Sequence, residues 1–222
     1  MIRLVGVSKY YNQHTGLDDI NLDIAQGDMV FITGHSGAGK TSILKLLMMI
    51  ERCSKGQVYI NNQNLNNIKR KQIPHLRRQM GMVFQDPKLI ATMSVYDNVA
   101  LPLVISGLKP KEIRRRVQAA LDKVSLLDKA EVFPVELSCG EQQRIGIARA
   151  VVNRPSILLA DEPTGNLDPD LSMDIMALFE AFNDVGVTVV IATHDLAIIA
   201  QMHHRIVSLK QGKIIAAKEA YV

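Results

Sequence analysis

The chain has 222 residues, 47% of them hydrophobic, with 26 basic and 22 acidic side chains. This content suffices for one large domain, or a domain with an inserted lobe, around a sizeable core. The net charge of +4 is too small for a dedicated nucleic-acid binder, but it suits a protein that holds a polyphosphate or works beside an anionic membrane. Without a leader-like segment or an apolar run of ~20 residues, we expect a cytoplasmic protein. Its two cysteines, Cys53 and Cys139, lack metal-binding spacing and are expected to be reduced.

The first quarter of the chain predicts strands before a phosphate-binding loop. Residues 2–7 and the alternating residues 17–24 indicate an antiparallel edge. Between these strands we expect a loop that carries Tyr10 and Tyr11. The two aromatic rings could pack against the core, or one of them could stack on a nucleobase.

Residues 34–41 read Gly-His-Ser-Gly-Ala-Gly-Lys-Thr and match the phosphate-binding pattern GxxxxGK[ST]. An apolar strand is predicted before this loop, over 29–33, and a helix after it, over 42–50, with Ile50 on the apolar face. This context disfavours a chance Gly/Ser turn. Lys40 is expected to neutralise β- and γ-phosphate charge, and the Thr41 hydroxyl to bind Mg²⁺. The predicted nucleotide-binding residues here are Gly34, His35, Ser36, Gly37, Ala38, Gly39, Lys40, Thr41 and Ser42.

Two further predicted strands end in polar side chains. Gln85 follows the strand 80–84, and Asp161 and Glu162 end the strand 156–162. Because the carboxyl ends of parallel strands form the ligand-binding edge of α/β sheets, these residues are expected in the site. Adjacent carboxylates repel each other unless a cation or a proton is nearby. We therefore assign Asp161 to Mg²⁺ and Glu162 to polarising water.

The strand 187–192 is followed by His194. A histidine there is often a structural hydrogen-bonding residue, but its place at a strand end favours a role in the site. A helix over 170–183 precedes this strand, and a hairpin over 205–217 closes the chain.

The middle of the chain predicts a helical lobe between sheet strands. The basic stretch 64–78 is interpreted as a solvated face, and residues 94–124 as helix. A further helix begins near Ser138 and runs to about residue 153. Ser138 and Glu141 fit a capping box, while the same helix start also presents free N–H groups to an anion, and both interpretations can hold together.

These motifs together resemble the ATP-binding cassette (ABC) ATPases, and the resemblance covers essentially the whole chain. Six motifs occur in the family's order: Walker A at 34–41, a Q-loop at Gln85, a signature at 137–142, Walker B at 157–162, a D-loop at 166–168 and an H-loop at His194. Tyr11 falls at the family's base-stacking aromatic, with Tyr10 as the alternative.

The resemblance implies an α/β P-loop NTPase fold, with a RecA-like, mainly parallel sheet, an N-terminal antiparallel β edge and an inserted helical subdomain. It implies one nucleotide-binding domain over 1–222. Residues 1–87 and 155–222 would form the catalytic core with its β subdomain, and residues 88–154 the helical subdomain with the signature.

The resemblance also implies ATP hydrolysis in a head-to-tail homodimer with ATP between the subunits. Ser138 and Gly140 would act in trans on the γ-phosphate. Glu162 would be the general base, and His194 would hold the γ-phosphate and the attacking water. The remaining implied assignments are Gln85 in catalysis and on Mg²⁺, and Tyr11, Glu141 and Asp168 in nucleotide binding. Cys139 departs from the usual Leu-Ser-Gly-Gly signature and puts the hydrolysis rate and the dimer affinity in question.

Within the family, the segments 34–40, 77–79, 96–100, 113–117 and 160–168 resemble the cell-division (FtsE) subfamily. That resemblance implies an integral membrane partner of the FtsX type, bound near residues 90–105, and indirect links to other division proteins. The complex would regulate septal peptidoglycan hydrolysis from the cytoplasmic face of the bacterial inner membrane, at the septum.

Several alternatives stay open. The ATPases of lipoprotein release and macrolide efflux have much of the same sequence in these segments, and they are the alternative assignment within the family. An ATP-gated scaffold with little hydrolysis is compatible with Cys139. A nucleic-acid repair or translation ATPase is disfavoured, since the chain has one cassette and no sustained heptads, and we expect no nucleic-acid partner. A GTPase is disfavoured because no Asn-Lys-x-Asp sequence occurs.

Overall fold

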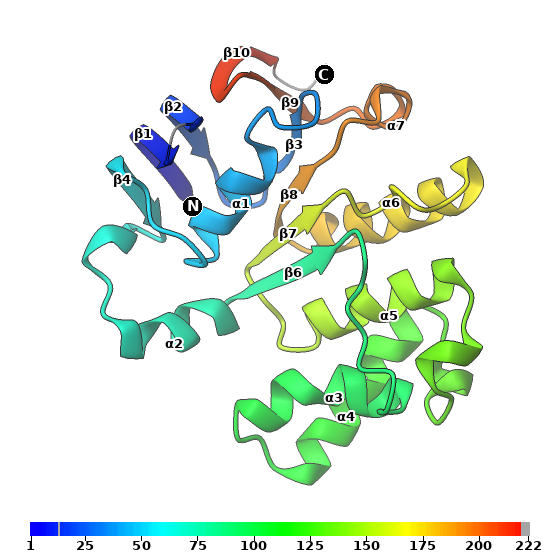
Figure 1. Ribbon diagram of the computed structural model, residues 1–222. Helices are drawn as coiled ribbons and strands as arrows, with labels where there is room; N and C mark the ends of the chain where they lie inside the picture. The colour runs from blue at the N-terminus through cyan, green and yellow to red at the C-terminus, as the bar shows by residue number, and fades with distance from the viewer. Residues whose placement is uncertain (13, 219–222) are drawn as a thin grey trace.

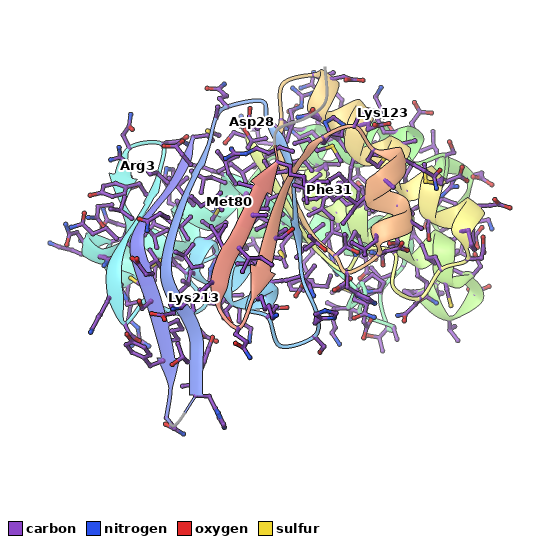
Figure 2. The ribbon with its side chains drawn as sticks, turned by 90° about the horizontal axis from the view of Figure 1, so that it is seen from above. Arg3, Asp28, Phe31, Met80, Lys123 and Lys213 are labelled. Atoms are coloured by element: carbon purple, nitrogen blue, oxygen red, sulfur yellow. The ribbon has the colours of Figure 1, made fainter. Side chains whose placement is uncertain are left out.

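The computed structural model describes residues 1–12 and 14–218, and it folds into two sheets with helices around them (Figure 1). A six-stranded sheet has the order β10-β9-β3-β8-β7-β6, and a four-stranded sheet has the order β2-β1-β4-β5. In the view from above, the four-stranded sheet lies on one side and the helical lobe on the other (Figure 2). No helix in the described ranges is long and apolar enough to cross a membrane.

The six-stranded sheet is parallel except for its last edge strand. β3 lies between β8 and β9, β7 lies beside β8, and β10 pairs antiparallel with β9. The expected mainly parallel core is therefore confirmed. The strands are β3 Met29–Thr33, β6 Met80–Phe84, β7 Ile157–Asp161, β8 Thr188–Ala192, β9 Arg205–Lys210 and β10 Lys213–Lys218.

The four-stranded sheet is antiparallel, as expected, but its first hairpin is longer than the sequence suggests. Its strands are β1 Ile2–Tyr11, β2 His14–Ile24, β4 Lys55–Ile60 and β5 Gln63–Asn64. Tyr10 and Tyr11 end β1 and do not lie in a loop, because pairing continues from Ile2 with Ile24 to Tyr11 with His14. Cross-strand pairing thus overrides the weak alternation of residues 8–11.

The helices agree with the predicted order. The predicted helical stretch 94–124 is two helices, separated where Gly107 has a φ of 74° and Pro110 opens the second helix. The α-helices are α1 Lys40–Leu47, α2 Ile73–Arg78, α3 Val95–Ile105, α4 Pro110–Lys123, α5 Cys139–Val151, α6 Pro169–Asp184 and α7 Leu196–Gln201. The 3₁₀ turns are η1 Leu65–Asn67, η2 Arg70–Gln72, η3 Leu127–Lys129 and η4 Pro134–Glu136.

The helix after the phosphate-binding loop starts and ends earlier than predicted. It begins at Lys40 because Gly39, with a φ of 109°, serves as its N-cap. It ends at Leu47, and Met49 follows in the left-handed region with a φ of 52°. The prediction that Ile50 lies on the apolar face was wrong, since its side chain is 52% exposed.

The six-stranded sheet separates two hydrophobic clusters. Val30, Ile32 and Leu159 face the cluster that includes α1 and the four-stranded sheet. Phe31 and Leu158, one residue away along the same strands, face the cluster that includes α3 to α6. Alternate residues of each strand therefore fill opposite faces, as a sheet covered on both sides requires.

The helical lobe meets the sheet most closely where α5 crosses β6. A Cβ placed on Gly81 would lie 2.5 Å from the carbonyl oxygen of Ala150 and 2.9 Å from a methyl of Leu158. Only a glycine therefore allows the backbone of α5 to lie this close to β6.

We predict that Gly81→Ala lowers the free energy of unfolding by about 1–3 kcal/mol, because the methyl group overpacks this contact. Urea denaturation measures the loss. Ala177→Ser adds one atom at an exposed position of α6, and this control should change stability by less than about 0.5 kcal/mol. Equal stability of Gly81→Ala and the parent chain would contradict the close packing.

Candidate nucleotide site

The predicted site residues gather at one edge of the six-stranded sheet, where the carboxyl ends of β3, β6, β7 and β8 meet (Figure 1). A cleft of about 540 Å³ lies there, within the ~300–1,000 Å³ range of small-molecule sites. Of the residues singled out at strand ends, Gln85, Glu162 and His194 line it, whereas Asp161 does not. The predicted loop residues Gly34 and His35 do not line it either. Its lining comprises Tyr11, His14, Thr15, Gly16, Ser36, Gly37, Ala38, Gly39, Lys40, Thr41, Ser42, Gln85, Glu162 and His194.

Two glycines let the loop between β3 and α1 close tightly. Gly34 has a φ of 153°, and a Cβ on it would lie 2.4 Å from the carbonyl oxygen of Leu209 in β9. Gly39 has a φ of 109°, and a Cβ there would lie 2.8 Å from the carbonyl oxygen of Gly16 in β2. The loop thus fits between the two sheets, and α1 directs its N-terminal N–H groups toward the cleft, which favours an anion.

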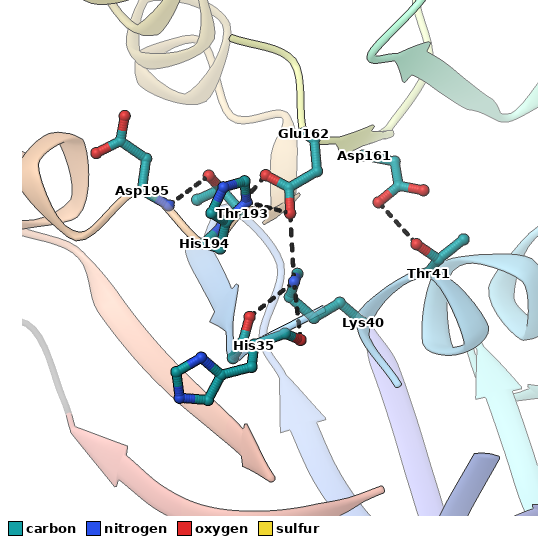
Figure 3. A network of polar contacts seen from close by, with 9 residues as sticks. His35, Lys40, Thr41, Asp161, Glu162, Thr193, His194 and Asp195 are labelled. Atoms are coloured by element: carbon teal, nitrogen blue, oxygen red, sulfur yellow. Dashed lines mark hydrogen bonds and ion pairs between the residues drawn. The ribbon is translucent and has the colours of Figure 1, made fainter. Parts of the chain in front are cut away.

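Lys40 and Glu162 form the central ion pair of the site (Figure 3). Lys40 Nζ lies 3.2 Å from Glu162 Oε1 and donates to the carbonyl of Gly34 at 2.7 Å. Its side chain is almost fully buried. On its other side, Glu162 meets His194, with Nδ1 2.9 Å from Oε1 and the His194 backbone N–H 3.2 Å from Oε2.

The two adjacent carboxyls have opposite pKa shifts. Burial, and then the charge of Glu162, raise the pKa of Asp161 above its usual value. Burial also opposes ionisation of Glu162, but hydrogen bonds from His194 and Lys40 outweigh burial, so the pKa of Glu162 is lowered. Glu162 is therefore firmly ionised near neutral pH, while the hydrogen bond from Thr41 and the charges of Lys40 and Lys45 only partly offset the rise in the pKa of Asp161.

The chain offers only oxygen ligands for a metal. Thr41 Oγ1 donates to Asp161 Oδ1 at 3.1 Å. The described residues contain no cluster of three or more His, Cys, Asp or Glu side chains that could hold a metal by themselves. A hydroxyl and a carboxylate whose pKa is raised by burial fit Mg²⁺, which takes most of its ligands from phosphate and water.

Tyr11 lies at the end of β1 and closes one side of the cleft. Its hydroxyl is 3.2 Å from Ser42 Oγ, and the ammonium of Lys9 lies 5.1 Å from its ring centroid. A Cβ on Gly16 would lie 2.4 Å from the ring, so this glycine makes room for it. Sequence reasoning missed His14, Thr15 and Gly16, since only the length of the β1–β2 hairpin brings them to the cleft.

Gln85, directly after β6, lines the same cleft and packs against Gly165. The segment it begins is bound to α5. Gln143 donates to the carbonyl of Phe84 at 3.0 Å, and Arg149 donates to the carbonyls of Pro87 and Lys88. The sequence analysis did not identify Gln143 or Arg149. The available signal for Arg149 was an arginine within the otherwise apolar residues 145–151.

The signature segment lies outside the nucleotide cleft, since no residue of 137–142 lines it. The capping box is confirmed: Ser138 Oγ accepts from Glu141 N–H at 3.3 Å, and Ser138 N–H donates to Glu141 Oε2 at 2.9 Å. The ammonium of Lys129, together with the Ser138 N–H, lowers the pKa of Glu141 to about 2. Ser138 and Cys139 are exposed, while Gly140 packs on Leu171 of α6.

Asp168, predicted to bind nucleotide, caps a helix in this chain. Its Oδ1 accepts from the N–H of Leu171 at 3.0 Å and so starts α6. Its side chain, like Ser138 and Cys139, is on the surface. Two predicted nucleotide-binding residues, Ser138 and Asp168, are therefore exposed and lie outside their own chain's cleft.

Comparison with known proteins agrees with this geometry. The profile of the ABC transporter family matches residues 17–165. This chain belongs to the ABC transporter family. It is an ABC ATPase cassette that binds ATP, as the order of its motifs predicted.

The relatives cover nearly the whole chain. The cell division ATP-binding protein FtsE of Escherichia coli (strain K12) is 54% identical over 215 residues, 96% of this chain and 97% of the relative. A dimeric structure of MJ0796, a bacterial ABC transporter cassette, superposes with a TM-score of 0.91 at 35% identity, with both chains fully covered. A dimeric post-hydrolysis structure of MJ0796, bound to ADP and Pi, has a TM-score of 0.91 at 34% identity, also over both full chains. The predicted fold class and family are confirmed.

We predict that Asp161→Asn stabilises the nucleotide-free chain at pH 7. The pKa of Asp161 is higher in the folded chain than in the unfolded chain. At a pH above the folded-state pKa, the ionised carboxylate therefore lowers the free energy of unfolding. This destabilisation disappears as the pH falls below the unfolded-state pKa. The gain in the urea midpoint should therefore shrink on acidification. The control Asp168→Asn should leave stability unchanged, because asparagine is an equally good N-cap. A destabilised Asp161→Asn variant would contradict this assignment.

Proposed function

We propose that the chain is the ATP-hydrolysing subunit of a membrane complex of the FtsE type, which couples ATP-driven dimerisation to a membrane partner in cell division. The observation that carries the enzymatic part is the Lys40–Glu162–His194 cluster at the end of the parallel strands. The 54% identity to FtsE over 96% of the chain supports the cell-division part.

In the proposed reaction, Lys40 and the N-terminal N–H groups of α1 hold the β- and γ-phosphates of ATP. When the phosphates engage Lys40, its pairing with Glu162 weakens and the carboxylate is left to accept a proton from the attacking water. His194, already bound to Glu162, positions that water and the γ-phosphate. Tyr11 stacks on the base, with Ser42 holding its hydroxyl.

Thr41 and Asp161 are the proposed protein ligands of Mg²⁺, with Gln85 on the same side of the cleft. Bound there, Mg²⁺ would neutralise phosphate charge in the transition state. The raised pKa of Asp161 supports this assignment, because a cation would stabilise its ionised form.

The site is proposed to be completed by a second copy of the chain. Ser138 and Gly140 are the groups assigned to act in trans, and Ser138 is exposed. Glu141 and Asp168 are assigned to nucleotide binding, and Asp168 is exposed. The dimeric MJ0796 structures support such an assembly. In this proposal, residues 88–154 form the lobe that brings the signature to the other subunit, and residues 1–87 with 155–222 form the catalytic core.

The membrane partner is proposed to dock at residues 90–105. Ile90, Val104 and Ile105 are exposed there by 38%, 57% and 66%. Arg149 and Gln143 bind the Q-loop segment to α5, so motion at this surface would reach both Gln85 and the signature. Docking would place the cassette peripherally at the cytoplasmic face of the bacterial inner membrane, at the division site. Lipoprotein-release and macrolide-efflux complexes are the alternative assignment, and a scaffold with little hydrolysis is another.

The enzymatic proposal is tested with Glu162→Gln. We expect ATP turnover to fall at least about 100-fold, because the general base is lost. ATP affinity should be retained, and size-exclusion chromatography should show an ATP-dependent dimer. Glu131→Gln changes an exposed glutamate of the helical lobe and should hydrolyse ATP normally. Unchanged turnover in Glu162→Gln would refute the assignment.

The docking proposal is tested with the double variant Val104→Glu/Ile105→Glu. Affinity purification from detergent-solubilised membranes should recover an integral membrane partner with the parent chain and lose it with this variant, because charge is placed in an apolar contact. ATP binding should be unaffected. Val185→Glu/Ile215→Glu makes the same changes at apolar side chains exposed by 77% and 62% elsewhere, and this control should retain the partner. Equal recovery with both variants would rule out this surface.

A further inference from the structure

One long stretch of the chain carries basic residues and no acidic residue. Residues 52–85 hold seven basic residues and no acidic one. The rest of the chain holds the other 19 of the 26 basic residues and all 22 acidic residues. Its formal net charge is therefore −3, whereas that of the whole chain is +4. The seven are Arg52, Lys55, Lys69, Arg70, Lys71, Arg77 and Arg78.

Two of these residues hold the fold together. Arg52 donates to the carbonyls of Leu65, Asn66 and Ile68, in and after η1. Arg77 donates to the carbonyls of Met48 and Met49, just after α1. The guanidinium groups of Arg52 and Arg77 are thus hydrogen-bonded to backbone carbonyls of the chain itself.

Lys69, Arg70 and Lys71, which form the start of η2, have no such role. All three are exposed, and the described part of the chain shows no ion pair or side-chain hydrogen bond for them. The nearest acidic residues in sequence, Glu51 and Asp86, are already paired with lysines. The first turn of α2, which follows them, contains no acidic residue either. The charge of these three exposed side chains is therefore available to a partner outside the chain.

The position of this triplet narrows the choice of partner. Arg78 at the end of α2 donates to the carbonyl of Ile105 at 3.3 Å, so α2 lies against the end of α3. The exposed side chains of Val104 and Ile105 therefore lie near Arg78 at the C-terminal end of α2, and the triplet lies just before the N-terminal end of this six-residue helix. In Figure 1, α2, α3 and α4 occupy the lower end of the molecule, and the hairpin of β9 and β10 lies at the upper end.

We propose that Lys69, Arg70 and Lys71 bind the anionic headgroups of a membrane leaflet, next to the docking surface at 90–105. Clustered lysines and arginines beside apolar side chains bind anionic bilayers diffusely, through charge and limited apolar contact. This proposal depends on the proposed function, because docking at residues 90–105 is what would turn the triplet toward the membrane. It adds direct contact between the cassette and lipid.

A nucleic acid fits the same surface less well. Between Tyr59 and Phe84 the sequence has no Phe, Tyr or Trp to stack on a base, and His75 is the one aromatic ring there. The adjacent Val104 and Ile105 offer apolar contact, which a phosphate backbone does not use.

The experiment measures co-sedimentation of the purified chain with vesicles, without any membrane partner. Vesicles of phosphatidylcholine with phosphatidylglycerol are compared with vesicles of phosphatidylcholine alone, at low and at high salt. We expect binding to the anionic vesicles only, weakened by salt. In Lys69→Gln/Arg70→Gln/Lys71→Gln, binding should fall at least about tenfold.

The matched control is Lys210→Gln/Lys213→Gln/Lys218→Gln, which removes the same charge from exposed lysines of the β9–β10 hairpin, at the opposite end of the molecule from α2. It should bind anionic vesicles within about twofold of the parent chain, and both variants should keep parental ATPase activity. Equal losses in the two variants, equal binding to neutral vesicles, or tighter binding to an oligonucleotide than to anionic vesicles would overturn the proposal. Because no partner is present, failure here would leave the docking experiment with Val104 and Ile105 untouched.

Discussion

The parallel register of β6, β7 and β8 is the constraint on which the site depends. Phe84 pairs with Asp161, and Asp161 pairs with Ala192. Phe84, Asp161 and Ala192 thus form one row across the sheet. The residues that follow them, Gln85, Glu162 and Thr193, therefore leave the sheet at the same level. A slip of one residue would send alternate side chains to the opposite face and separate these groups. The two hydrophobic clusters prevent such a slip, because each strand residue belongs to one face or the other.

At the edge of this sheet, the ammonium group of Lys40 contacts several oxygen atoms at once. Lys40 binds the carbonyls of its own loop and the carboxylate of Glu162, in a site where little water screens the charge. Glu162 also has a positive φ of 48°, and its N–H donates to the carbonyl of Ala192. The strained backbone aims Glu162 at Lys40 and His194, while the adjacent Asp161 points to Thr41 (Figure 3). Such strain is found where structure is held for function.

The second half of the proposed composite site is built by helix ends. Ser138 starts α5 and Asp168 starts α6, and both are capping residues whose exposed positions leave them open to another subunit. The same helix α5 binds the segment after Gln85 through Gln143 and Arg149. One rigid element thus connects the outward-facing signature to the inward-facing Q-loop, which gives a physical route between a docked partner and the nucleotide.

The sequence by itself determined the strands of the parallel core, the glycine loop with Lys40 and Thr41, and the polar residues at the strand ends, because these depend on local periodicity and on short motifs. It also predicted the Ser138–Glu141 capping box, which needs only neighbouring residues. Tertiary structure decided the length of the β1–β2 hairpin, the exposure of Ile50 and the placement of Tyr11 on Ser42. It also decided which charges are used internally, such as Arg77, and which remain exposed, such as Arg70. Each of these outcomes rests on contacts between residues far apart in the chain, and such contacts have no signature in a local window of sequence.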